Sequence, residues 1–175
     1  MNKRITIRHL GPKEAAACVP ALADVLIDCV EGGASVSFMW PLPRAKAVAF
    51  WQGVAEGVAR NDRVLLVAED NAGQLVGTVQ LMLAMPDNQP HRADVAKMLV
   101  RRSARRRGIA QQLMAAVDDA ARAHGKHTLV LDTVTGGDAE RLYARSGWQP
   151  VGEIPRFALM PDGQPCSTTY FYKQI

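Results

Sequence analysis

The sequence has no long apolar segment, and none of its hydrophobic runs approaches the roughly 20 residues that a bilayer-spanning helix requires. The basic N-terminal segment also lacks the apolar core of a signal peptide. We therefore expect no membrane partner and a cytoplasmic protein. A length of 175 residues, with 48% hydrophobic and 22% charged residues, predicts a single domain, residues 1–175, with one good core.

Cysteine is scarce. The three cysteines, Cys18, Cys29 and Cys166, match the spacing of neither a disulfide framework nor a metal site. Their odd number also argues against a set of bridges. We expect a reducing compartment, such as the cytoplasm, and no metal.

Aromatic residues make up only 6% of the chain, and none lies near its most basic stretch. The net charge is +4, and five arginines cluster at Arg101, Arg102 and residues 105–107. A basic patch can bind nucleic acid, but a single-strand groove also needs aromatic side chains for base stacking. A polyanionic cofactor is the simpler explanation, so we expect no nucleic-acid partner.

The stretch from Val95 to Ala116 carries the strongest signal in the sequence. It starts as a short apolar run that is typical of a buried strand, passes through the basic turn, and continues with helical periodicity from Ile109. The first N–H groups of a helix have no partner within it, and they carry the positive end of its dipole. The changeover at Gly108 therefore predicts a phosphate site, because a side chain there would push the anion away.

The spacing Arg105-x-x-Gly108-x-Ala110 resembles the acetyl-CoA signature of the GNAT N-acetyltransferase superfamily, in the same place between a strand and a helix. A second stretch, Ala139-x-x-Leu142-Tyr143-x-x-x-Gly147-Trp148, resembles the closing signature of that superfamily. The two signatures occur in the family's order and on the expected elements.

Periodicity and turn residues predict the same order of elements as the GNAT fold. We expect an α/β (α+β) protein whose central mixed, mostly antiparallel sheet of about seven strands has helices on both faces. Strands are predicted at residues 4–9, 63–69, 74–84, 91–100, 127–133, 148–159 and 167–173. Helices are predicted at residues 20–31, 44–60, 108–124 and 138–146.

The resemblance implies acetyl-CoA as co-substrate and assigns its contacts. The strand residues Met98, Leu99 and Val100 are expected to bind the pantetheine amides. Tyr143 is expected to protonate the departing thiolate. Many relatives carry Asn where this chain has Gly136, so Asp138 or the loop backbone is expected to hold the pantetheine arm instead. The pyrophosphate is assigned to the backbone of Arg105, Arg106, Arg107, Gly108, Ile109, Ala110 and Gln111.

Direct attack by an amine also needs a base. The pKa of an α-amine lies within about one unit of neutral pH, so a weak base is sufficient to remove its proton. Asp94, predicted to share a strand face with Met98, and Asp132, a carboxylate at the end of an apolar strand, are the candidates, with His91 third. Each aspartate also has a structural alternative: Asp94 in a pair with Arg92 or His91, and Asp132 as a loop cap.

Within the superfamily the chain resembles the tabtoxin-resistance type. The resemblance lies at residues 32–39, 92–95, 103–105, 112–114, 131–133 and 161–163. It implies a small amino-acid-like acceptor, an antibiotic or toxin such as tabtoxinine-β-lactam, and hence antibiotic resistance. The expected acceptor contacts are Ser35, Phe38, Met39 and Asp94.

Two alternatives stay open. A protein or peptide N-acetyltransferase would use the loops at residues 38–40 and 85–90 as a peptide groove. A non-catalytic acetyl-CoA-binding module would keep the cofactor site alone. The chain is expected to be a monomer or a homodimer, with the last two strands able to pair across subunits.

Overall fold

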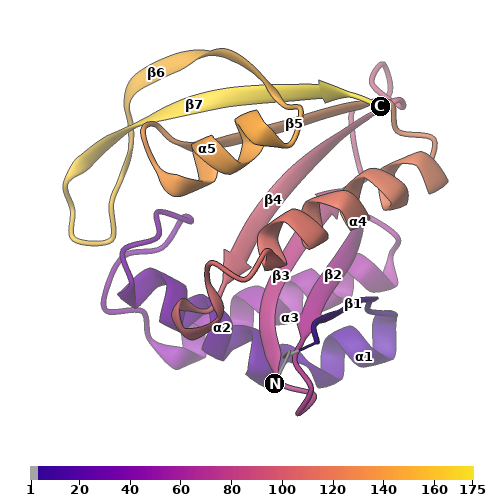
Figure 1. Ribbon diagram of the computed structural model, residues 1–175. Coiled ribbons are helices and arrows are strands. Elements are labelled where there is room, and N and C mark those ends of the chain that lie inside the picture. Colours follow the sequence, from indigo (N-terminus) through magenta and orange to yellow (C-terminus); the bar gives the residue numbers. More distant parts are fainter. Residues whose placement is uncertain (1–3) are drawn as a thin grey trace.

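A computed structural model describes residues 4–175 and shows one seven-stranded sheet with helices on both faces (Figure 1). The strand order is β1-β2-β3-β4-β5-β7-β6, and only β4 and β5 pair in parallel among the described strands. The strands are β1 (Thr6–His9), β2 (Arg63–Glu69), β3 (Leu75–Met82), β4 (Arg92–Val100), β5 (Thr128–Val134), β6 (Gln149–Leu159) and β7 (Pro165–Gln174). The helices are α1 (Pro12–Ala17), α2 (Val19–Glu31), α3 (Arg44–Ala59), α4 (Ile109–Ala123) and α5 (Asp138–Arg145), with a 3₁₀ turn, η1 (Arg102–Ala104).

The predicted fold is confirmed; the boundaries move by a few residues, and a short helix, α1, precedes the four predicted ones. Pro20 lies in the first turn of α2, where its missing N–H has no intrahelical partner to lose. The returning strand of the first hairpin, predicted over residues 74–84, is shorter, because Leu83 and Ala84 bond to the Asp62 carbonyl instead of continuing the ladder. No helix in the described part of the chain is long and apolar enough to span a membrane.

The sheet separates two apolar clusters. One lies between the sheet and α1, α2 and α3, and it includes Leu65, Val67 and Leu99. The other lies between the sheet and α4 and α5, and it includes Val95 and Tyr143. The side chains of β4 and β5 therefore point either toward α3 or toward α4, so the face that each one occupies decides which side of the site it can reach.

A β-bulge in β4 changes which face of the sheet the following side chains occupy. Gln80 pairs with Ala96 and Thr78 with Leu99, so two β4 residues lie opposite one β3 residue. Leu99 consequently packs on the α3 side, while Met98 packs on the α4 side. Asp94 lies between Ala93 and Val95, which both face α4, and so it points toward α3. The prediction that Asp94 and Met98 share a face is wrong, because regular alternation stops at the bulge.

The two parallel strands separate after a short contact. Only Arg92, Ala93 and Asp94 of β4 pair with β5, and the remainder of each strand diverges from the other (Figure 1). This leaves an opening in the sheet between the C-terminal halves of β4 and β5.

Candidate active site

The N-terminus of α4 begins at Gly108, which is the N-cap of the helix and has a left-handed backbone with φ of 72°. A Cβ added at this glycine would meet no atom within 4 Å, so the space in front of the first helical turn is open. The free N–H groups of that turn point into this space, together with the positive end of the helix dipole. The geometry fits a phosphate, as the sequence predicts.

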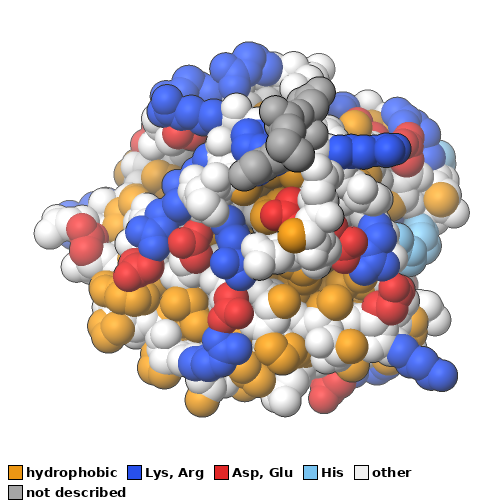
Figure 2. Space-filling view, turned by 60° about the horizontal axis from the view of Figure 1, so that its bottom comes forward, with side chains coloured by type: hydrophobic (Ala, Val, Ile, Leu, Met, Phe, Trp, Pro, Cys, Tyr) orange, Lys and Arg blue, Asp and Glu red, His pale blue; other side chains and the backbone are white. Residues whose placement is uncertain are grey.

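The arginines of the basic turn have different surroundings. Arg102 donates to the Asp28 carboxylate at 3.0 Å and also pairs with Glu31, and these bonds raise its pKa. Arg105 donates through Nε to the Val100 carbonyl at 3.2 Å. On the face shown in Figure 2, Lys and Arg side chains are interspersed with Asp and Glu. Arg102 is thus neutralised by α2 and is not available to an anion.

At the start of α5, the Asp138 carboxylate is paired with Arg141, which lowers its pKa, and Arg106 and Arg105 add smaller contributions. Asp138 therefore lies near the basic turn, as its predicted cofactor contact requires. Glu140, which the sequence reasoning did not select, holds the preceding loop by accepting from the Gly136 N–H and from Thr169 Oγ1.

The unpaired edge of β4 is the second feature of the site. Beyond Asp94, the peptide groups that face the opening have no strand partner on β5. Met98 to Val100 lie in this part of β4, so their backbone could hydrogen-bond an extended ligand that enters the opening. This position matches the predicted pantetheine contact.

Tyr143 lies on α5, on the α4 side of the opening. Its side chain is only 5% exposed, and its ring packs against Trp148 and Phe171, with ring centroids 6.1 Å apart in both pairs. Burial raises the pKa of Tyr143, and the negative charge of Asp132 raises it further. Within residues 4–175 no group hydrogen-bonds the Tyr143 hydroxyl, so it is free to donate to a ligand.

The two candidate bases differ in their partners. Asp94 forms an ion pair with Arg92, which is the structural alternative that the sequence left open. Asp132 is exposed on the α3 side of β5, and it accepts one hydrogen bond, from Thr168 Oγ1 at 2.9 Å. His91 is exposed at the start of β4, and its carbonyl accepts from His127. Each carboxylate keeps one oxygen without a hydrogen bond among residues 4–175, but Asp132 has no salt-bridge partner there, whereas Asp94 is paired with Arg92.

The loop between α2 and α3 reaches across to the β6–β7 turn. Ser35 Oγ donates to the Leu159 carbonyl at 2.9 Å, and the Trp40 N–H donates to the Pro161 carbonyl at 3.0 Å. Phe38 is 9% exposed and meets the Phe50 ring edge-on, whereas Met39 is 44% exposed. Of the predicted acceptor contacts on this loop, Met39 alone has a large exposed side chain.

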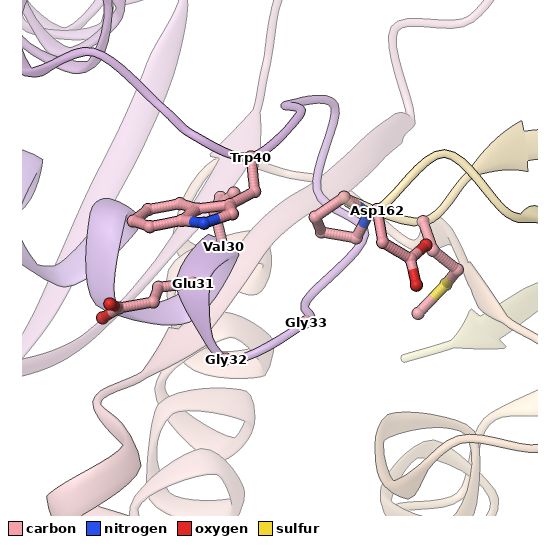
Figure 3. Close-up of a pocket in the computed structure, with 8 residues that line it drawn as sticks. Val30, Glu31, Gly32, Gly33, Trp40 and Asp162 are labelled. Carbon is pink, nitrogen blue, oxygen red and sulfur yellow. The ribbon is translucent and has the colours of Figure 1, made fainter.

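A cavity of about 350 Å³ lies between this loop and the β6–β7 turn. Trp40 and Glu31 line one side and Asp162 the other, with Gly32 and Gly33 below (Figure 3). No β4 or β5 residue lines this cavity, so it is distinct from the opening in the sheet.

Lys97 is a residue of the opening that the sequence reasoning missed. It lies in the β4 bulge and has a positive φ of 53°. Its signal in the sequence was a single charged residue inside the otherwise apolar end of a strand. In the part of the chain that the structure describes, no group of three His, Cys, Asp or Glu side chains could hold a metal ion.

Comparison with known proteins agrees with this fold. The model of the acetyltransferase (GNAT) family matches residues 24–148. An uncharacterized N-acetyltransferase encoded in the hisH-hisA intergenic region of Azospirillum brasilense is 32% identical over 113 residues, which cover 63% of this chain. The match spans 65% of that relative's length, slightly less than two thirds.

Two solved structures show the same fold. A ribosomal-protein-alanine N-acetyltransferase from Brucella melitensis has a TM-score of 0.78 at 24% identity, covering 97% of this chain and 99% of its own. A Salmonella typhimurium protein solved with its cofactor acetyl-CoA has a TM-score of 0.75 at 19% identity, covering 97% of this chain and 93% of its own. At these identities the likeness concerns the fold.

Proposed function

Because the chain belongs to the acetyltransferase (GNAT) family, a family of acetyl-CoA-dependent N-acetyltransferases, we propose that it acetylates the primary amine of a small amino-acid-like molecule. The observation that carries this proposal is the opening between β4 and β5. A phenol with no hydrogen-bond partner among residues 4–175 lies on its α4 side, and a carboxylate without a salt-bridge partner in the same range lies on its α3 side.

The chain offers a fitting place for each part of acetyl-CoA, which supplies the thioester. The open space at Gly108 and the first turn of α4 would hold the pyrophosphate. The unpaired edge of β4 at Met98 to Val100 would bind the pantetheine amides, and a free N–H there would stabilise the oxyanion. Asp138, near Arg105 and Arg106, would lie beside the same ligand.

The reaction balances with two protein groups. The amine nitrogen forms a bond to the acetyl carbon, the carbon–sulfur bond breaks, and the sulfur takes the proton that Tyr143 holds at its hydroxyl. The acceptor ammonium loses two protons in all. The first passes to Asp132, directly or through water, and from there to solvent; the second leaves the nitrogen as the amide forms and restores the proton of Tyr143. Since burial raises the pKa of Tyr143 above the ordinary value of 10, the phenol keeps its proton at neutral and mildly alkaline pH and can give it to the departing sulfur.

A small acceptor is supported by the loop between α2 and α3. Its hydrogen bonds to the β6–β7 turn, from Ser35 and Trp40, bridge two segments at one end of the opening. An extended polypeptide would have to displace this bridge. A role in antibiotic resistance, and a reducing location such as the cytoplasm, belong to the same proposal; all three cysteines are free.

The proposal is tested by measuring acetyl-CoA turnover with a panel of acceptors, using the released CoA thiol as the readout. The panel contains amino acids, β-lactam amino acids, aminoglycosides, polyamines and short peptides. We expect turnover with amino-acid-like amines. Turnover confined to peptides would establish the protein N-acetyltransferase instead. Binding of acetyl-CoA without turnover of any amine would indicate a non-catalytic module.

We expect substitutions of the two aspartates to have different effects on kcat/KM in this assay. Asp132→Asn removes the base and lowers kcat/KM at neutral pH by about 10- to 100-fold, with partial recovery at high pH as the free amine accumulates. Asp94→Asn removes the partner of Arg92, and we expect kcat/KM to stay within about threefold of the wild type, since a partly exposed ion pair contributes little. A larger loss in Asp94→Asn than in Asp132→Asn would transfer the role of base to Asp94.

The arginines of the basic turn should also differ. Arg106→Gln removes a cation near the cofactor site, and we expect acetyl-CoA to bind about 3- to 10-fold more weakly, with a smaller deficit at high salt. Arg102→Gln is the matched control. Its charge is already neutralised by Asp28 and Glu31, so the dissociation constant should change by less than about twofold. Titration calorimetry at two salt concentrations measures the acetyl-CoA dissociation constant of both variants. Equal losses of affinity in the two variants would contradict the assignment of Arg106 to the cofactor site.

A further inference from the structure

Lys97 projects from the β4 bulge toward the α3 side of the sheet. Its Nζ lies 5.7 Å from the centre of the Phe50 ring and donates to Ser37 Oγ at 3.0 Å. Phe50 belongs to α3, and Ser37 belongs to the loop between α2 and α3. The ammonium therefore lies on the same side of the opening as Asp132, opposite to Tyr143.

The charge of Lys97 has no carboxylate partner in the part of the chain that the structure describes. Among residues 4–175, no Asp or Glu oxygen lies within 4.0 Å of its Nζ, and only one of the three donors of the ammonium is used. The Phe50 ring attracts the cation from one side. Burial lowers the pKa of Lys97, and the more distant Asp132 opposes this. A partly buried cation with unused donors can bind an anion through charge-assisted hydrogen bonds.

The hydrogen bond between Lys97 and Ser37 joins two left-handed residues. Lys97 has φ of 53° and Ser37 has φ of 77°, and neither is a glycine. L-residues adopt this conformation at a cost, and such residues cluster at ligand sites. Two of them, 60 residues apart in sequence, meet here at one ammonium group.

We propose that Lys97 binds a carboxylate of the acceptor, so that the acceptor is an amine that also carries a carboxylate. This inference rests on the proposed function and adds a specificity-determining residue to it. Asp132, on β5, faces the amine, and Lys97, on β4, faces the carboxylate. The opening thus presents one negative and one positive group to a zwitterion. A simple amine would leave Lys97 unmatched and would be repelled by it.

The test compares amino acids with their decarboxylated amines, such as phenylalanine with phenethylamine and lysine with cadaverine. Each acceptor is assayed with wild-type protein and with Lys97→Met, which keeps an unbranched side chain one atom shorter and removes its charge. We expect kcat/KM for the amino acid to fall about 10- to 100-fold, mainly through KM, while that for the amine stays within about threefold. Because each acceptor is compared between two proteins, the intrinsic pKa of its amine cancels.

Two further variants separate binding from packing. Ser37→Ala removes the hydrogen bond but keeps the cation, and we expect it to retain the preference for amino acids. Lys46→Met removes a second lysine that lies over a phenylalanine ring, 5.9 Å from the centre of Phe38, but on the exposed surface. Lys46→Met should leave kcat/KM unchanged for both the amino acid and the amine. Equal losses for both acceptors in Lys97→Met, or a wild-type protein without preference for the carboxylate, would overturn the proposal.

Binding provides an independent readout. If wild-type protein binds acetyl-CoA but acetylates no amine, the proposed function fails, and the role of Lys97 is then decided by calorimetry of each amino acid with CoA-loaded protein. Binding that is lost in Lys97→Met would support the carboxylate site. Equal binding by both proteins, or binding by neither, would refute it.

Discussion

Tyr143→Phe should lower kcat about 100- to 1,000-fold while leaving the dissociation constant of acetyl-CoA nearly unchanged. The substitution removes a hydroxyl on the α4 side of the sheet that has no hydrogen-bond partner among residues 4–175, and it keeps the ring that packs against Trp148 and Phe171. The loss should therefore concern the departure of the thiolate and not the folding of α5. Stopped-flow or steady-state thiol release, together with calorimetry of acetyl-CoA, measures the two quantities.

Tyr172→Phe is the matched control. It removes a hydroxyl on β7 that donates to Gln149 at 2.7 Å, on an exposed part of the sheet, and kcat should stay within about twofold of the wild type because surface changes of this kind have small effects. A similar loss in both variants would show that the effect of Tyr143→Phe is structural.

The pH dependence provides a second check on Tyr143. A group whose folded pKa is raised stays protonated below that pKa and loses its proton only above it. Since burial raises the pKa of Tyr143 above 10, the wild-type rate should show no decline below about pH 10 from loss of this proton. A descending limb near pH 8 that disappears in Tyr143→Phe would contradict the environment described for this residue.

Gly108→Val should weaken acetyl-CoA binding about 100-fold. The side chain would enter the open space in front of α4, where the phosphate oxygens would accept from the first N–H groups of the helix. It would also impose a left-handed backbone on a β-branched residue, at a cost of about 1–2 kcal/mol in the free energy of unfolding.

The other end of α4 offers a control for this strain. Gly125 also has a positive φ, 65°, and also has no atom within 4 Å of an added Cβ, but it lies about 23 Å away along the 15-residue helix. Gly125→Val should lose a similar unfolding free energy, measured by denaturant titration, and keep its affinity for acetyl-CoA. An equal loss of affinity in both variants would remove the phosphate site from the N-terminus of α4.

Local chemistry determined much of this protein from the sequence alone. The passage from an apolar strand through Gly108 into α4 is visible because helical periodicity, glycine and the basic turn are features of neighbouring residues. The same holds for the motif around Tyr143 and for the hairpins with their turn residues. The seven strands, and the sheet with helices on both faces, follow from that order of elements.

The tertiary structure alone decided which side chains meet at the opening. The bulge at Lys97 adds one residue to β4, so Met98 and Asp94 lie on opposite faces, and no period-two pattern predicts where that residue is inserted. Arg102 is paired with Asp28 and Glu31 because α2 packs beside the basic turn. Asp94 is paired with Arg92, two residues away, because both side chains point to the same face of β4. Lys97 and Ser37 are 60 residues apart, and only the packing of the α2–α3 loop on the sheet brings them together. Contacts of this kind arise from how the elements pack, which local periodicity does not encode.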